Sequence, residues 1–184
     1  MAIHIEIHDD DEKELTRIRT QLLGLRNVAG ISQQQLSVLA GRSHKWLNEL
    51  EQAVGHPHLS SLQQWAGVFD LRLEPKFSDL IEWSPNGIPN QVLLNWQMSY
   101  RGSRPFRAYD WQRVHLISEL VAYRHAAQVS ATELSGRLGL SVSAVSGWER
   151  DGNDPLVSKV FTYVRALGGS VTFALVGIAD WKHE

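Results

Sequence analysis

The sequence of 184 residues contains no cysteine, and this absence excludes several kinds of chemistry at once. Disulfide bonds, thiolate zinc sites and a cysteine nucleophile all need a residue that the chain lacks. No apolar run approaches the roughly 20 residues needed to span a bilayer. The N-terminal segment becomes acidic at Asp9, whereas a signal peptide has a basic start and an apolar core. We therefore predict a cytoplasmic protein that does not contact membranes.

Sequence motifs of common enzymes are missing as well. The chain has no Gly-rich phosphate loop, no G-x-S-x-G or H-E-x-x-H motif, and no prominent pair of aligned carboxylates. His56 and His58 flank Pro57 without further ligands at metal-binding spacing, which is more typical of a loop than of a metal site. The sequence therefore predicts no enzyme, no metal and no cofactor.

The charge balance also argues against one class of DNA-binding protein. The net charge is −2 and the pI is about 6.4, whereas purely electrostatic, histone-like binders usually have a pI above about 9. Apolar residues make up 43% of the chain, with seven Trp, which is enough to build a folded core.

An internal repeat is the most informative feature of the sequence. Residues recur without a gap at an offset of 98, and both turn residues and apolar positions take part. A repeated spacing indicates a repeated structural unit. The matching residues of the first copy are Arg26, Ala29, Ser32, Leu36, Ser37, Gly41, Ser43, Glu51 and Pro57, and those of the second are Arg124, Ala127, Ser130, Leu134, Ser135, Gly139, Ser141, Glu149 and Pro155.

The first copy predicts a series of helices. Apolar residues from Leu15 to Leu25 recur every three to four positions, which predicts an amphipathic helix over about 13–28. Ser32 and Gln35 have the spacing of a capping box. Gly41 is suited to the left-handed turn that ends this helix. Ser43 then caps a helix over about 44–51, and a last helix is predicted over about 60–69.

The second copy repeats this pattern. We expect Asp110 to cap a helix that runs to about Arg124, and Ser130 with Glu133 to form a second capping box. Gly139 and Ser141 then end one helix and begin the next. A short helix, a tight glycine turn and a second short helix are typical of a helix-turn-helix motif.

The segments SQQQLSVLAGRSHKWLNELE (32–51) and SATELSGRLGLSVSAVSGWER (130–150) carry a family resemblance. Each is followed by a loop with a proline, and together they resemble the Xre family of Cro-like and lambda-repressor-like proteins, which includes phage repressors. This family commonly has Gln as the first residue of the second helix, a position held by Gln33 in one copy and Ala131 in the other. The first copy also has bulky Trp46 where small residues are usual.

The resemblance implies a mainly α fold with two lambda-repressor-like helix-turn-helix domains in tandem. We predict an N-terminal domain over 1–80, a linker over 81–108 and a C-terminal domain over 109–184. Alternating apolar residues predict short peripheral strands at Ile3–Ile7, at Leu71–Leu73 and at Val171–Leu175. The strands either pack within the chain or form the contact of a homodimer.

Base contacts are expected at the N-terminal end of each recognition helix, because this end enters the major groove. In the second copy these residues offer only an apolar contact to thymine and weakly selective hydroxyl bonds, so this copy is either a weaker DNA contact or a dimerisation module. The candidates are His44, Lys45, Asn48 and Glu49 in the first copy and Val142, Ser143 and Ser146 in the second.

Contacts to the DNA backbone are expected from the helix starts and from nearby cations. Three arginines of the linker lie in a segment without acidic residues and resemble the arms that enter a minor groove, with a solvated linker as the alternative. The phosphate candidates are Ser32, Gln33, Arg42, Ser43, Ser130, Ser141 and Arg150, and the minor-groove candidates are Arg101, Arg104 and Arg107.

These observations predict a transcriptional regulator of phage or host type that binds double-stranded DNA and associates with the nucleoid. We expect repression by promoter occlusion at an asymmetric operator. An antitoxin-like protein that binds a protein partner as well as its own promoter is the main alternative.

Overall fold

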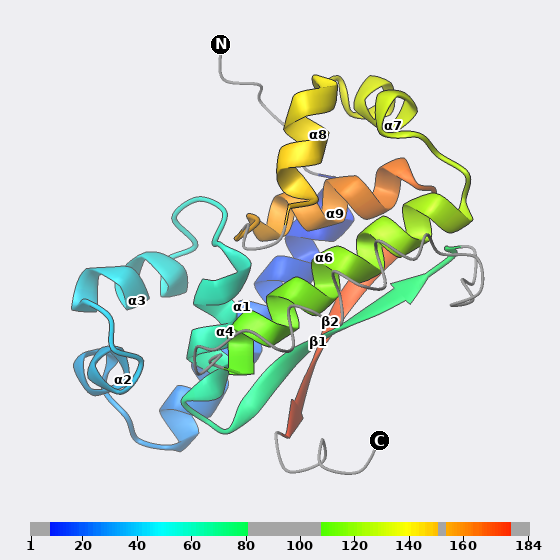
Figure 1. Cartoon of the computed structure of the whole chain (residues 1–184). Coiled ribbons are helices and arrows are strands. Elements are labelled where there is room, and N and C mark those ends of the chain that lie inside the picture. The colour runs from blue at the N-terminus through cyan, green and yellow to red at the C-terminus, as the bar shows by residue number, and fades with distance from the viewer. Residues whose placement is uncertain (1–7, 81–107, 151–153, 178–184) are drawn as a thin grey trace.

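The computed structural model describes residues 8–80, 108–150 and 154–177, which form eight helices and two strands (Figure 1). The mainly helical fold with short strands that the sequence predicts is therefore confirmed. The elements are α1 (Asp9–Val28), α2 (Gln33–Leu39), α3 (His44–Glu51), α4 (Leu59–Gly67), β1 (Leu71–Ser78), α6 (Ala108–Ala126), α7 (Ala131–Leu138), α8 (Val142–Trp148), α9 (Val157–Ala166) and β2 (Ser170–Gly177). We call residues 8–80 the first half and residues 108–177 the second half.

The long first helix of each half begins earlier than the sequence predicts. In α1 the His8 side chain accepts a hydrogen bond from the Asp10 amide, and Asp9, Asp10 and Asp11 place negative charge at the positive end of the helix. In α6 the helix begins at Ala108, so the prediction that Asp110 caps it is wrong. Ala108 and Tyr109 are both tolerated in a helix. The helix therefore starts two residues before Asp110, which lies inside the first turn.

The two strands pair with each other inside one chain. β1 and β2 run antiparallel, with Leu73 opposite Leu175, Pro75 opposite Phe173, and Phe77 opposite Val171. The strands that the alternation of apolar residues predicts at Leu71–Leu73 and at Val171–Leu175 are therefore confirmed. Intramolecular packing, one of the two alternatives for these strands, is what the structure shows. The strand expected at Ile3–Ile7 lies outside the described residues.

The middle of this ladder explains how a proline fits into a strand. The Phe173 N–H donates to Glu14 Oε1 at 2.7 Å, and the Phe173 carbonyl accepts from Arg17 Nη2 at 2.5 Å. Both backbone groups of Phe173 therefore bond to α1 and not to β1, which marks a non-hydrogen-bonded pair of an antiparallel ladder. Pro75, directly opposite, needs no N–H to pair with β2.

The first helix of each half packs against the other half. α1 contacts α9 and β2, while α6 contacts α4 and β1, and Figure 1 shows α6 running beside β1. An ion pair of 2.5 Å between Arg165 and Asp11 adds to the contact of α1 with α9. Buried apolar side chains from both halves form one cluster, which includes Ile18, Trp65, Leu134 and Phe173. The division into separate domains at 1–80 and 109–184 stays a prediction.

The loops before α4 and α9 also meet. The Leu59 N–H donates to the Pro155 carbonyl at 2.9 Å, and the Val157 N–H donates to the Pro57 carbonyl at 2.9 Å. His58 and Leu156 form the β-bridge between these two bonds. Strand-like backbone pairing therefore joins the halves at two places, this bridge and the β1–β2 ladder.

Candidate nucleic-acid interface

The turn between α2 and α3 forms as the sequence predicts. Ser32 accepts from the Gln35 amide, and the Gln35 side chain accepts from the Ser32 amide, which completes the capping box. Gly41 has φ of +66°, the left-handed conformation that favours glycine. Ser43 accepts from the Trp46 amide at 3.4 Å and begins α3. These contacts fix the angle between the two short helices.

The turn between α7 and α8 has the same construction. Ser130 accepts from the Glu133 amide, Gly139 has φ of +64°, and Ser141 accepts from the Ala144 amide. The Glu133 carboxylate accepts from Arg137 Nη2 at 2.6 Å, and the structure shows only the Ser130 half of the predicted capping box.

The start of α3 presents polar and charged side chains to the outside. His44 and Lys45 are exposed, and Asn48 and Glu49 are half-buried one turn further on. The Lys45 ammonium is 3.5 Å from the Glu49 carboxylate, and its side chain remains 82% exposed. These side chains can donate to or accept from base edges.

Trp46, on the same helix, has a different role. Its indole Nε1 donates to Ser61 Oγ at 3.3 Å, which ties α3 to α4. The bulky Trp46 side chain therefore helps to hold α3 in place.

The start of α8 carries no charge. Val142 and Ser143 are exposed, and Ser146 is half-buried. Ser143 Oγ lies 3.0 Å from Ser141 Oγ, so its hydroxyl already has a hydrogen-bond partner within the turn. The exposed starts of α3 and α8 therefore differ in charge and hydrogen-bonding groups, as their sequences indicate.

Two of the predicted phosphate contacts have partners within the protein. Gln33 Nε2 donates to the Glu51 carboxylate at 2.6 Å, and Arg42 Nε donates to Gln64 Oε1 at 2.5 Å. The predicted serines all cap helices through their hydroxyls, and Arg150 is exposed beyond α8. Contact of these residues with the phosphate backbone of DNA stays a prediction. Arg101, Arg104 and Arg107 lie outside the described residues.

A largely buried ion pair, with side chains 7–14% exposed, holds the end of α3 and of α8, and sequence reasoning missed it. In the first half Arg26 Nε and Nη2 donate to Glu51 at 2.5 and 3.1 Å, and Arg26 Nη1 donates to the Ile31 carbonyl at 2.9 Å. In the second half Arg124 makes the same bonds, to Glu149 at 2.7 and 2.8 Å and to the Val129 carbonyl at 3.0 Å. The recurrence of these residues at the offset of 98 was the available signal.

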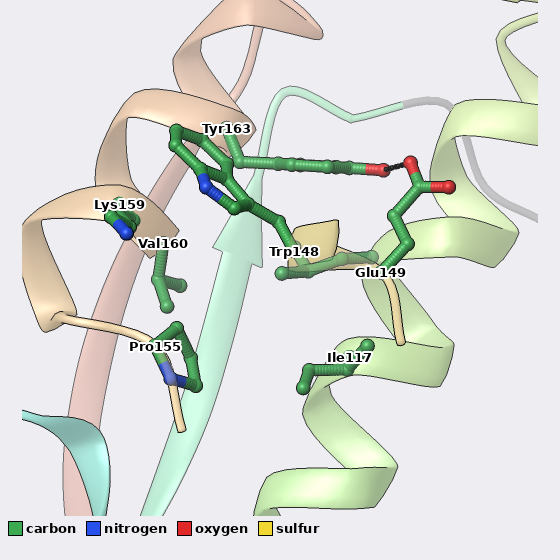
Figure 2. A pocket seen from close by; sticks show the side chains of 8 residues that line it. Ile117, Trp148, Glu149, Pro155, Lys159, Val160 and Tyr163 are labelled. Atoms are coloured by element: carbon green, nitrogen blue, oxygen red, sulfur yellow. Dashed lines mark hydrogen bonds between the residues drawn. The ribbon is translucent and has the colours of Figure 1, made fainter. Parts of the chain in front are cut away.

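The two halves complete this ion pair with different donors. Glu51 accepts a further hydrogen bond from Gln33, whereas the equivalent position in the second half is Ala131, whose side chain has no donor. There Glu149 accepts instead from the Tyr163 hydroxyl at 2.7 Å, as Figure 2 shows. Burial, together with the neighbouring Glu149 carboxylate, raises the pKa of Tyr163, so the hydroxyl stays protonated and donates.

A small pocket lies beside this contact, between α6, α8 and α9 (Figure 2). Its wall includes Trp148, Pro155 and Val160, and the Lys159 ammonium lies 5.2 Å from the centre of the Trp148 ring. Although burial acts in the opposite direction, the hydrogen bond and charge of Glu149 raise the pKa of Arg124. The Glu149 carboxylate, at one end of the pocket, is therefore already paired with the Arg124 guanidinium.

Comparison with known proteins supports the assignment of the second motif. Residues 120–173 match the family model described as Helix-turn-helix. These residues form a helix-turn-helix domain. The chain is also 35% identical over 60 residues to the protein named Antitoxin HigA1 in two strains of Mycobacterium tuberculosis. This match covers 33% of the present chain and 40% of the relative, so the chain spans less than half of that protein. No solved structure matches the chain.

Two further properties apply to the described part of the chain. No helix there is long and apolar enough to cross a membrane. No group of three or more His, Cys, Asp or Glu residues within it could hold a metal ion, and His56 and His58 are both exposed.

Proposed function

We propose that the protein is a sequence-specific transcription regulator that contacts DNA with two helix-turn-helix motifs carried by one chain. The observation that carries this proposal is that α2–α3 and α7–α8 have the same capping serines and the same left-handed glycine between their helices. The second helix of a helix-turn-helix motif fits the major groove with its N-terminal residues against the base edges. The family match of residues 120–173 supports DNA binding by this motif.

The first recognition helix supplies the main base contacts. Lys45 donates to guanine O6 and N7, Asn48 pairs with adenine, and His44 donates to a purine N7 or to a phosphate. Glu49, which lies beside Lys45, accepts from cytosine N4 and orients the ammonium. We expect each good contact to contribute about 1–3 kcal/mol of discrimination against the wrong base.

The second recognition helix supplies weaker contacts. Val142 meets a thymine methyl group, and Ser143 and Ser146 offer hydroxyl bonds with little selectivity. The operator is therefore asymmetric: the half-site that α3 contacts has a strongly specified base sequence, and the half-site that α8 contacts has a weakly specified one. Bound at a promoter, the protein represses transcription by excluding the polymerase, in the manner of a phage or host repressor. It acts in the cytoplasm, on the nucleoid, without catalysing a reaction.

A protein partner is the second candidate, and exposed apolar side chains in the first half favour it. Val28 is 91% exposed at the end of α1, and Val38 and Leu39 are exposed at the end of α2. Their equivalents in the second half are Ala126, Gly136 and Arg137, so these three large apolar side chains have no counterparts of similar size there. The relative named as an antitoxin agrees with this second role. Replacement of Val38 and Leu39 by Ser should then abolish partner binding and leave DNA affinity unchanged.

Selection of binding sites from a random duplex library tests the main proposal. The purified chain should enrich one sequence. Lys45→Ala and Asn48→Ala should each weaken binding to that sequence by about 5- to 150-fold, and the double variant should weaken it further. Lys13→Ala is the matched control, because Lys13 is an exposed cation that pairs with Asp10 on α1 and lies outside the motif. If no sequence is enriched, DNA recognition is the wrong function and the protein-partner role takes its place.

A further inference from the structure

We infer that one chain spans an entire two-part operator as an internal twofold dimer, with the sites of α3 and α8 arranged as an inverted repeat, because the two halves meet at equivalent residues. This inference rests on the proposed function and adds to it the orientation of the two half-sites and the number of chains that bind them.

The first set of symmetric contacts lies in the loops before α4 and α9. His58 and Leu156 are separated by the offset of 98, and they form a β-bridge with each other. The flanking bonds, from Leu59 to Pro155 and from Val157 to Pro57, exchange places when each residue is replaced by its equivalent. Two equivalent residues can contact each other in this way only beside a twofold axis.

The second set of symmetric contacts lies in the sheet. Pro75 and Phe173 are also separated by 98 positions, and they are opposite each other in the ladder. The pair of Leu73 with Leu175 becomes the pair of Val171 with Phe77 under the same exchange. The ladder is therefore symmetric about its centre, and this centre and the loop bridge together define one axis.

This axis determines how the recognition helices are oriented. A simple translation from one half to the other would place β1 and β2 in the same direction and would keep equivalent residues apart. The observed rotation makes α3 and α8 point in opposite senses along any duplex that both contact. The two half-sites are then inverted with respect to each other, as in the operators of twofold dimers.

The cross-packing of the halves fixes the spacing between the half-sites. α1 is bonded to β2 and α9 through the contacts of Arg17, Glu14 and Asp11 with the second half, and buried apolar side chains from both halves share one core. A core-like contact of this kind does not behave as a flexible linker. Only one spacer length should therefore allow both helices to bind.

The decisive experiment makes the two recognition helices alike. The four base-facing residues of α3 are transferred to the equivalent positions of α8 by the substitutions Val142→His, Ser143→Lys, Ser146→Asn and Gly147→Glu. The first two positions are exposed, and a Cβ at Gly147 would meet no atom within 4 Å, so the fold should accept them. Site selection is then repeated with the grafted chain, and the mass of the complex gives the number of chains per duplex.

We expect the grafted chain to select an inverted repeat of the sequence that α3 selects, with one chain per duplex. Insertion of about 5 base pairs, half a helical turn, between the half-sites should reduce affinity to that of a single half-site. A direct repeat, a single half-site or two chains per duplex would overturn the inference and leave the proposed DNA recognition intact. Failure of the wild-type chain to select any sequence would instead reject the proposed function.

A second measurement applies to the wild-type recognition helices and does not depend on the graft. The chain has no cysteine, so a single cysteine can carry a DNA-cleaving reagent at one chosen site. Gln34 and Thr132 are equivalent and exposed positions on α2 and α7. Gln34→Cys and Thr132→Cys should give cleavage patterns on the selected site that are related by a dyad between them. Patterns related by translation along the duplex would overturn the inference.

Discussion

Tyr163→Phe removes a single oxygen atom and tests how the second recognition helix is held. The hydroxyl donates to the Glu149 carboxylate at 2.7 Å, and Tyr163 is 3% exposed. A buried hydrogen bond to a charged group contributes about 1.5–3 kcal/mol. Because Arg124 still pairs with Glu149 in the variant, we expect the lower end of this range, about 1.5–2 kcal/mol. For a protein of this size the melting temperature should fall by about 3–8 °C.

The hydrogen bond from Gln33 to Glu51 in the first half suggests a substitution that should restore the stability lost in Tyr163→Phe. Gln33 supplies the third donor to Glu51 there, so Ala131→Gln should place an equivalent donor beside Glu149. In the Tyr163→Phe background this substitution should recover at least about 1 kcal/mol, whereas in the wild type it should gain almost nothing. Urea denaturation of the four proteins, followed by circular dichroism, gives the coupling between the two positions. Equal effects of Ala131→Gln in both backgrounds would show that the third donor does not support Glu149.

Three further predictions concern stability. Burial, with a smaller effect from the Glu74 carboxylate, raises the pKa of Glu119 to about 7, so the folded state binds more protons than the unfolded state and stability falls as pH rises from about 4.5 to 7. Glu119→Gln should therefore raise the free energy of unfolding at pH 8, by at most about 3 kcal/mol, and leave it nearly unchanged at pH 4; equal gains at both values would contradict this. Gly139→Ala should cost about 1 kcal/mol because φ is +64°, whereas the matched helical change Gly136→Ala should stabilise by about 0.5–1 kcal/mol in thermal melts. Glu14→Ala leaves the buried Phe173 N–H without its acceptor and should cost about 1–3 kcal/mol in urea titrations; a change below about 0.5 kcal/mol would show that another group replaces the carboxylate.

Local features of the fold were accessible from the sequence because each depends on residues close together in the chain. Ser32 with Gln35, and Gly41 before Ser43, are combinations whose hydrogen bonds and backbone angles need only a few neighbouring residues. The alternation around Phe173 likewise requires only that one face of a strand be buried. The start of α6 was placed wrongly because Asp110 is a good cap wherever a helix begins but does not by itself require a helix to begin there.

The arrangement of the two halves was not accessible in this way. The offset of 98 indicates that a unit recurs, but it carries no information on whether the second unit is translated or rotated. Pro75 is unsuited to most paired strands, and only its position opposite Phe173 shows why it is accepted there. The third donor to each buried ion pair was hidden for a similar reason. Gln33 and Tyr163 occupy different positions in their halves and converge only in space on equivalent carboxylates.

The contacts of α1 with the second half affect how the chain reaches its native state. Arg17 bonds to the carbonyl of Phe173, which follows it by 156 residues, and Glu14 bonds to the amide of the same residue. When α1 leaves the ribosome its partners in β2 and α9 have not yet been synthesised. α3 can already pack on α1 and pair with it through Arg26 and Glu51, but the part of α1 that contacts β2 and α9 stays uncovered until those elements emerge. Pairings over such long separations form slowly, because the loop between them must close first. The nascent first half is thus a species that chaperones can bind, and its exposed apolar surface favours aggregation until β2 arrives.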